Sequence, residues 1–393
     1  MQFSMTRLPR VEFGAGCLDK LPTIIRAYGQ RALFVTGQQS HNHSPLWEKL
    51  LTQLKTRNIT TLFATIDGEP SPQLVDQIVA QHRNDNIDCV IGLGGGSALD
   101  AAKAIAGLLN VDNSVMDFLE GVGPELPYHG PPVPFIAIPT TAGTGSEATK
   151  NAVLSQQGEN GFKKSFRDDK LVAEYAILDP RLLASCPKSL IAANGMDTIT
   201  QLMESYTSIN ANPFTDALAQ SGLLLAREAL FEWYKDGAAA EQAQSNMAYA
   251  AWLSGITLAQ VGLGSVHGLA SPLGAFFPVP HGVVCGTLLA EATAINIKAM
   301  QKREPQNPAL KRYAVMAEWL VGKCLADQQS AHAELITQLR SWVDQLELPR
   351  LSTYGITSDD FARIISNARG SSMKSNPVVL TDDEIRQVLI ARL

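Results

Sequence analysis

The chain has 393 residues, of which 45% are hydrophobic and 18% charged, so it has the composition of a folded protein and the length of two domains. Its 32 Lys and Arg residues against 38 Asp and Glu residues give a formal net charge of −6. That balance argues against nucleic acid as a partner, because phosphate binding needs a basic surface.

Short apolar segments alternate with helical patterns in the first half of the chain. The apolar segments predict strands at 31–36, 60–66, 89–93 and 133–138. Helical spacing of apolar residues predicts helices at 45–54 and 71–82, and a third that follows the glycines after residue 93 and ends near residue 109. Strands and helices that alternate in this way indicate an α/β domain with a parallel sheet covered by helices on both faces.

Helical patterns dominate the second half, at 213–237, 238–258, 308–325 and 331–346 among others. Strand-like segments are hard to find there. We therefore predict a dinucleotide-binding α/β domain over 1–184, with a Rossmann-like sheet, and an all-helical domain over 185–393.

The five cysteines are scattered and form no CxxC pair, which indicates reduced thiols in a cytoplasmic protein; they are Cys17, Cys89, Cys186, Cys285 and Cys324. The N-terminal segment has no signal-peptide pattern. Apolar residues never run uninterrupted for about 18 positions, so we expect no membrane span.

A glycine-rich turn connects the third predicted strand to the following helix, through Gly94, Gly95, Gly96 and Ser97. Glycines let a ligand approach the backbone, and the start of a helix offers unpaired N–H groups, so the turn suits a pyrophosphate. A tight strand-to-helix turn would explain the same glycines. The segment is not a GxGxxG fingerprint.

Hydroxyl groups follow the fourth predicted strand, at Thr140, Thr141 and Thr144 among others. They suit either a ligand-facing loop or a polar turn before a helix. Because the ends of parallel strands meet at one edge of the sheet, this loop and the glycine-rich turn together predict a cleft at that edge.

Four polar residues of the helical half could hold a metal ion. Asp197 and Gln201 are four apart on a predicted helix and share a face, while His267 and His281 lie in a segment with little charge. Two imidazoles and a carboxylate suit Zn²⁺ or Fe²⁺. Spacing alone equally allows both histidines to be buried core residues.

These motifs resemble the iron-dependent, or group III metal-dependent, alcohol dehydrogenases, whose architecture is that of dehydroquinate synthase. The resemblance covers nearly the whole chain and is strongest over 267–282. It also includes the segments 11–16, 94–103, 139–147, 179–180, 195–197, 211–213, 216–217 and 376–377.

The resemblance implies an NAD(P)-dependent enzyme that interconverts primary alcohols and aldehydes. Because members of this family commonly form dimers or higher assemblies, we also expect a homodimer or a larger homo-oligomer.

 

It places the cofactor's pyrophosphate on Gly95, Gly96 and Ser97, with Gly94 and Asp100 nearby and Thr140, Thr141 and Thr144 lining the cofactor site. It also assigns Asp197, His267 and His281 as catalytic metal ligands, because family members bind the metal through one Asp and three His.

Three positions depart from the family pattern. Gln201 stands where a third histidine ligand is usual, and a carboxamide is a weaker ligand than an imidazole. Ser271 replaces a histidine that is often part of a proton path. Gly37 stands where many NAD-preferring members carry an Asp, so the cofactor is expected to be NADP or NAD, with Gln38, Gln39 and Ser40 able to hydrogen-bond a 2′-phosphate.

Two alternative functions remain open from the sequence. A metal-independent NAD(P)H reductase on the same fold would need another electrophile, for which Lys163, Lys164 and Arg167 are candidates, although a solvated loop is the favoured explanation of these residues. A catalytically inactive relative that only binds nucleotide is the other alternative.

Overall fold

The computed structural model describes residues 2–38 and 45–393. They form two compact units, which we describe separately. The α/β unit consists of Met5–Gln156 and Lys163–Cys186, and the helical unit contains Pro187–Leu393 and the short segment Gln157–Phe162.

Six strands of the described α/β unit form one sheet in the order β1-β8-β5-β4-β2-β3, and all its pairings are parallel. The strands are β1 (Arg10–Phe13), β2 (Arg31–Gly37), β3 (Thr60–Ile66), β4 (Cys89–Gly94), β5 (Phe135–Pro139) and β8 (Tyr175–Leu178). The chain runs outward from β2 to β3 and then returns to place β4 on the other side of β2. The strand order therefore reverses at β2 and β4, where ligands of open α/β sheets bind.

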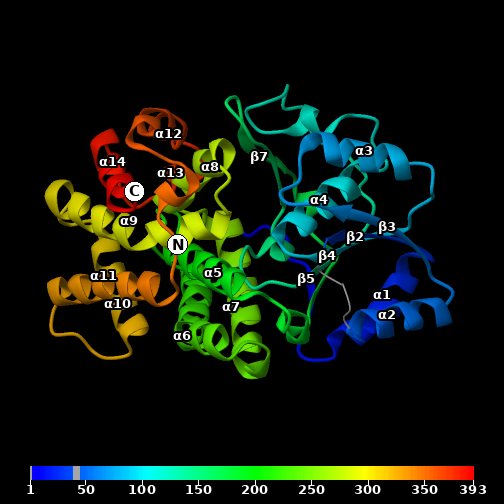
Figure 1. Ribbon diagram of the computed structural model, residues 1–393, viewed down its shortest axis with the longest axis horizontal. Coiled ribbons are helices and arrows are strands. Elements are labelled where there is room, and N and C mark those ends of the chain that lie inside the picture. The colour runs from blue at the N-terminus through cyan, green and yellow to red at the C-terminus, as the bar shows by residue number, and fades with distance from the viewer. Residues whose placement is uncertain (1, 39–44) are drawn as a thin grey trace. The chain divides into compact units, whose positions relative to one another are not determined.

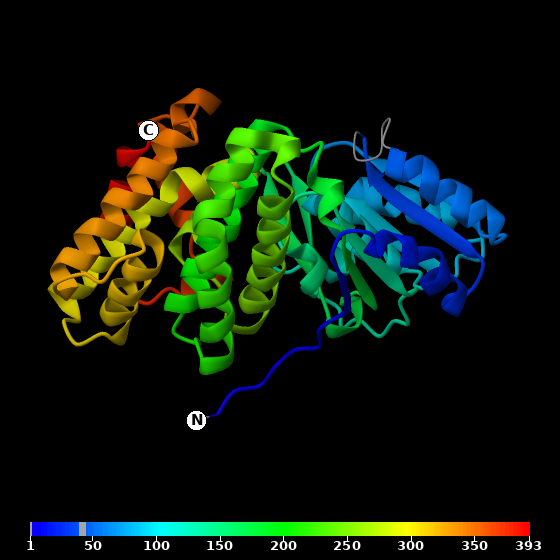
Figure 2. The same ribbon diagram turned by 90° about the horizontal axis from the view of Figure 1, so that it is seen from below.

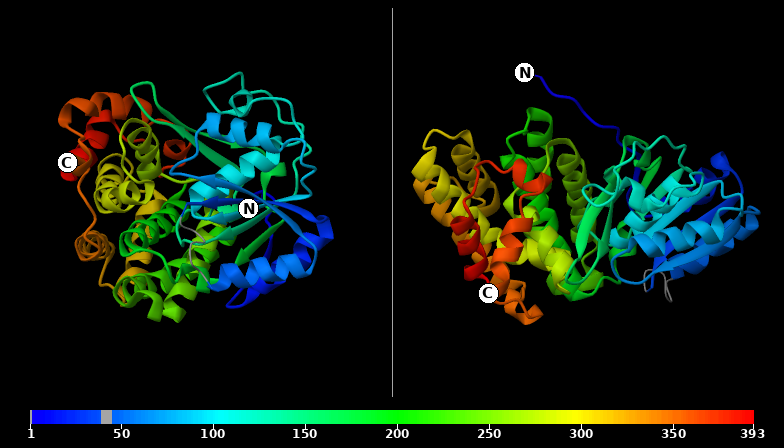
Figure 3. Two further views of the ribbon diagram at one scale, coloured as in Figure 1. Left: turned by 45° about the vertical axis from the view of Figure 1, so that its right-hand side comes forward. Right: turned by 90° about the horizontal axis from the view of Figure 1, so that it is seen from above.

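Helices cover both faces of this sheet (Figure 1; Figure 3, left), as the sequence predicted. One face carries α1 (Leu21–Tyr28) and α2 (Pro45–Thr56), and the other carries α3 (Pro72–His82) and α4 (Gly96–Leu108). Pro22 and Pro72 lie in the first turns of α1 and α3, where the missing N–H of proline leaves no hydrogen bond unmade.

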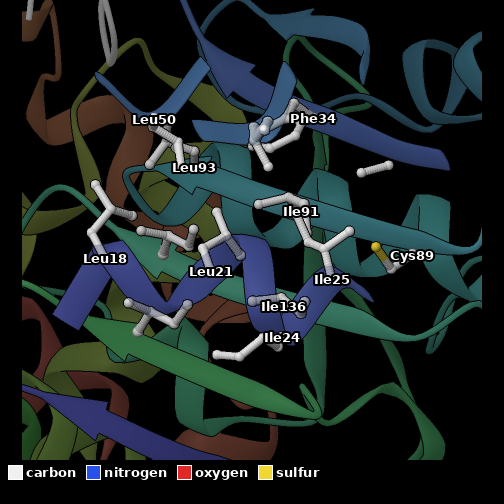
Figure 4. Packing of buried hydrophobic residues seen from close by; sticks show 14 of the residues in the cluster. Leu18, Leu21, Ile24, Ile25, Phe34, Leu50, Cys89, Ile91, Leu93 and Ile136 are labelled. Carbon is white, nitrogen blue, oxygen red and sulfur yellow. The ribbon is translucent and has the colours of Figure 1, made fainter. Parts of the chain in front are cut away.

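Apolar side chains fill the space between the sheet and α1 (Figure 4). Leu21 and Ile25 of α1 are fully buried against a cluster that includes Phe34, Ile91 and Ile136 from three neighbouring strands. This packing holds β2, β4 and β5 side by side and so fixes the relative positions of the loops that follow them.

Some elements of the α/β unit differ from the sequence prediction. The strand predicted at 133–138 is displaced to Phe135–Pro139. The strands β1 and β8 were not predicted, nor was the two-stranded sheet formed by β6 (Asn151–Gln156) and β7 (Phe162–Arg167).

The helical unit is built around α5, which packs against α6, α7 and α9; Figure 2 shows several of its long helices side by side. Its helices are α5 (Lys188–Thr207), α6 (Pro213–Asp236), α7 (Glu241–Val261), α8 (Ser265–Phe276), α9 (His281–Arg303), α10 (Pro308–Val321), α11 (Gln328–Gln345), α12 (Phe361–Asn367), α13 (Ser371–Lys374) and α14 (Asp382–Ala391). Helix α9 has the length and composition to cross a membrane, but 78% of its apolar window is buried inside the protein, as in a core helix.

Candidate metal centre and nucleotide site

The predicted cofactor residues lie at one edge of the parallel sheet. Gly37 ends β2, Gly94 ends β4, and Thr140 follows β5 and donates its N–H to the Gly94 carbonyl over 2.9 Å. Since the three strands are parallel neighbours, the loops after them start at the same edge. The structure therefore brings the glycine-rich turn together with the loop that contains Thr140, Thr141 and Thr144, which we call the threonine loop, within the α/β unit.

The two loops touch at the glycines. A Cβ atom on Gly96 would lie 2.6 Å from Thr144 Cγ2, so this packing itself requires a glycine. A Cβ atom on Gly95 would lie 3.5 Å from Thr141, which is an ordinary contact. Helix α4 begins at Gly96, and its first N–H groups, including that of Ser97, have no acceptor within the helix. These groups suit a phosphate.

A buried lysine braces the threonine loop. Lys103 is fully buried, and its Nζ donates to the Ser146 carbonyl over 2.8 Å and to the Asn151 carbonyl over 2.6 Å. Asp100 Oδ1 accepts from Ser146 Oγ over 2.5 Å and lies 3.7 Å from Lys103 Nζ. Burial raises the pKa of Asp100 and lowers that of Lys103, and their mutual attraction opposes both shifts. Asp100 thus has structural partners, and its contact with a cofactor stays a prediction.

Four donor groups converge in the helical unit, from α5, α8 and α9. Asp197, His267, His281 and Cys285 each offer one atom, and these atoms lie within 4.8 Å of one another. His267 Nε2 is 3.2 Å from Asp197 Oδ1, and His281 Nε2 is 3.9 Å from the same oxygen. The sequence prediction named the first three, and the structure brings them together.

A second carboxylate orients His267. Glu204 Oε2 lies 2.7 Å from His267 Nδ1, and Glu204 Oε1 accepts the Val266 N–H over 2.7 Å. Because a carboxylate accepts, Glu204 holds a proton on Nδ1, and Asp197 Oδ1 likewise favours a proton on Nε2. A bound cation would take the place of the Nε2 proton, while Nδ1 would keep its proton on Glu204. Such a carboxylate–histidine pair is usual beside a bound metal.

The electrostatics of this cluster attract a cation. Burial alone would raise the pKa of Asp197, but His281 and His267 lower it overall. Burial would lower the pKa of His267, yet Cys285, Asp197 and Glu204 raise it well above its ordinary value. Among the described residues, the buried Asp197 Oδ2 has no hydrogen-bond partner. A buried carboxylate oxygen in this state fits a site for a positive ion.

Gln201 lies one turn after Asp197 on α5, and its Oε1 is 2.6 Å from Ser254 Oγ. Its predicted role as a ligand stays a prediction.

Sequence reasoning missed Cys285 and Glu204. Cys285 is four residues after His281 and Glu204 is seven after Asp197, and both spacings place residues on one face of a helix.

Two of the three basic residues proposed for a metal-independent reductase are paired with carboxylates. Lys163 contacts Glu69, and Arg167 Nη2 lies 3.5 Å from Glu120. Both lie on β7, which belongs to the two-stranded sheet. Gln39 and Ser40, proposed to bind a 2′-phosphate, lie outside the described residues.

Comparisons with known proteins agree with this architecture. The sequence model of iron-containing alcohol dehydrogenases matches residues 9–180, and that of the C-terminal region of the same family matches residues 191–393. Alcohol dehydrogenase 4 of Schizosaccharomyces pombe is 32% identical over 96% of this chain and 86% of its own length.

Two further relatives differ in the cofactor that their names give. An NAD-dependent methanol dehydrogenase of Bacillus methanolicus is 29% identical over 97% of both chains. An NADPH-dependent butanol dehydrogenase of Clostridium saccharobutylicum is 29% identical over 97% of this chain and 96% of its own.

A solved structure of a 1,3-propanediol oxidoreductase superimposes with a TM-score of 0.89 and 26% identity, and covers 100% of both chains. The metal-independent and inactive alternatives are not favoured by these relatives. The chain therefore belongs to the iron-containing alcohol dehydrogenase family and is an NAD(P)-dependent oxidoreductase that acts on CH–OH groups.

Proposed function

We propose that this enzyme interconverts short primary alcohols and their aldehydes with the help of a divalent cation held by Asp197, His267 and His281. The relatives named for methanol, butanol and propanediol support the substrate class. The observation that carries the metal assignment is the convergence of these three side chains around Asp197, whose Oδ2 has no partner among the described residues.

Each residue of the centre has a separate task. When bound, a divalent cation supplies Lewis-acid polarisation of an alcohol or carbonyl oxygen. Asp197 contributes the negative charge that retains a cation, and His267 and His281 contribute neutral nitrogen donors. Glu204 holds the His267 ring in the tautomer and orientation that direct Nε2 toward Asp197.

The nucleotide is proposed to bind at the edge of the sheet in the α/β unit. The N–H groups of Gly96 and Ser97 at the start of α4 would hold its pyrophosphate, and Thr141 and Thr144 would flank it. At the end of β2, Gly37 offers no carboxylate to repel a 2′-phosphate. We therefore propose that the enzyme accepts NADP as well as NAD.

Initial rates with methanol, ethanol, n-propanol, n-butanol and isopropanol, each with NAD⁺ and NADP⁺, test this function. We expect kcat/KM for the best primary alcohol to exceed that for isopropanol by at least about tenfold, or ~1.4 kcal/mol in transition-state binding. A folded, metal-loaded enzyme that prefers isopropanol would contradict the substrate class. The absence of turnover with either cofactor and every alcohol would contradict the function itself.

A further inference from the structure

Gln201 departs from the family's set of metal ligands, and Cys285 restores the number of converging donors to four. Gln201 offers only a neutral carboxamide, and its Oε1 already lies at hydrogen-bond distance from Ser254 Oγ. Cys285 lies in the second turn of α9, on the same face as His281. Its sulfur is 3.6 Å from His267 Nε2 and 3.7 Å from His281 Nε2.

These separations match a tetrahedral zinc site. Bond lengths of about 2.3 Å to sulfur, about 2.05 Å to nitrogen and about 2.1 Å to oxygen place tetrahedral donors about 3.6 Å apart for S···N and about 3.4 Å apart for N···O. The S···N distances are 3.6 and 3.7 Å, and the N···O distances are 3.2 and 3.9 Å. Four of the six donor pairs are therefore within about 0.5 Å of the tetrahedral separations, and all four donor atoms lie within 4.8 Å of one another.

The surroundings of Cys285 suit a ligand rather than an exposed reactive thiol. Cys285 and Asp197 are both fully buried, and His267 is 8% exposed. The Asp197 Oδ2 atom without a partner in the described structure is a second sign that a cation belongs in the cluster. A coordinating thiol releases its proton to solvent when a divalent cation binds, so the sulfur binds as a thiolate.

From this geometry we infer that Cys285 is the fourth protein ligand of the metal and that the resulting Asp–His–His–Cys set selects zinc over iron. Thiolate is a softer donor than the imidazole it replaces, and zinc also stands above Fe²⁺ in intrinsic affinity for such ligands. The inference rests on the proposed metal centre, and it concerns which atoms hold the ion and which ion they select.

Cobalt substitution reads out the sulfur ligand directly. The full-length protein is stripped with a chelator, loaded with Co²⁺ and examined by absorption spectroscopy. We expect an intense sulfur-to-cobalt charge-transfer band in the near ultraviolet for the wild type and for Cys89→Ser, which alters an equally buried cysteine of β4. Cys285→Ser should lack this band. A cobalt-loaded wild type without the band would overturn the inference even if the Cys285 variant did not fold, and so would a Cys285→Ser protein that keeps it.

Metal competition tests the selectivity. Stripped protein is incubated anaerobically with equal concentrations of Zn²⁺ and Fe²⁺, and the bound metals are measured by mass spectrometry. The zinc-to-iron ratio should fall at least about tenfold from wild type to Cys285→Ser, equivalent to ~1.4 kcal/mol. An unchanged ratio would overturn the selectivity. Alcohol turnover that needs metal, in a protein without the sulfur band, would reject Cys285 as a ligand and leave the proposed function intact.

Discussion

Replacing Gly95 with alanine should weaken nucleotide binding while leaving the fold stable. Gly95 precedes α4 with φ −73° and ψ −178°, a conformation that alanine adopts without strain. Its added Cβ would lie 3.5 Å from Thr141, an ordinary van der Waals distance. Because alanine also restricts the unfolded chain, we expect the free energy of unfolding to stay equal or rise by about 0.4–1 kcal/mol.

The substitution should therefore weaken nucleotide binding and not the stability of the fold. A pyrophosphate held by the first N–H groups of α4 approaches the backbone at Gly95, where a methyl group would occupy part of its space. We expect the Kd for NADPH and NADH to rise at least about tenfold, or ~1.4 kcal/mol. Gly96→Ala is a poorer test, since its Cβ would lie 2.6 Å from Thr144 Cγ2 and disturb the loop without any ligand.

Fluorescence titration of the reduced cofactors and urea unfolding measure the two quantities separately. Gly370→Ala is the matched control, because Gly370 precedes α13 with φ −71° and ψ −170° and its Cβ would meet nothing within 4 Å. The control should keep wild-type affinity. If Gly95→Ala binds both cofactors as tightly as the wild type, the pyrophosphate does not lie at the start of α4.

Three other substitutions test separate parts of the account. Gly37→Asp should shift the ratio of kcat/KM values toward NAD, since a carboxylate repels a 2′-phosphate; an unchanged ratio would place Gly37 away from the ribose. Glu204→Gln should lower zinc affinity about 10–100-fold in a chelator competition, because the His267 ring loses its charged acceptor; wild-type affinity would refute that role. Lys103→Met should lower the free energy of unfolding in urea by about 3–5 kcal/mol, since it leaves buried acceptors unpaired. A loss below about 1 kcal/mol would argue against a stabilising role for the hydrogen bonds of Lys103.

The main elements of the fold could be predicted from local patterns. The strand at 60–66 and the helix at 71–82 follow from continuous apolar or periodic residues, and the structure has them within one residue. The strand β1 contains Arg10 and Glu12 within four residues, and β7 contains two lysines and an arginine. Such strands form because they pair with neighbouring strands, and a local sequence pattern carries no information about that pairing.

The metal-binding residues could be predicted from the sequence where they belong to residue types that commonly bind metals. Asp197, His267 and His281 stand out because aspartate and histidine are common ligands and the chain has few histidines. Cys285 was considered only together with the other cysteines, and its spacing of one helical turn from His281 was not used. The contact of Gly96 with Thr144 and the brace from Lys103 depend on segments more than 40 positions apart, which only the folded chain brings together.

Metal removal and restoration test the central claim most directly. The enzyme is dialysed against a strong chelator, its metal content is measured by mass spectrometry, and turnover of n-propanol is followed with NAD⁺ and NADP⁺. We expect activity to fall in proportion to the metal removed and to return when Zn²⁺ or Fe²⁺ is added to the stripped protein. Full turnover by a metal-free protein would contradict it.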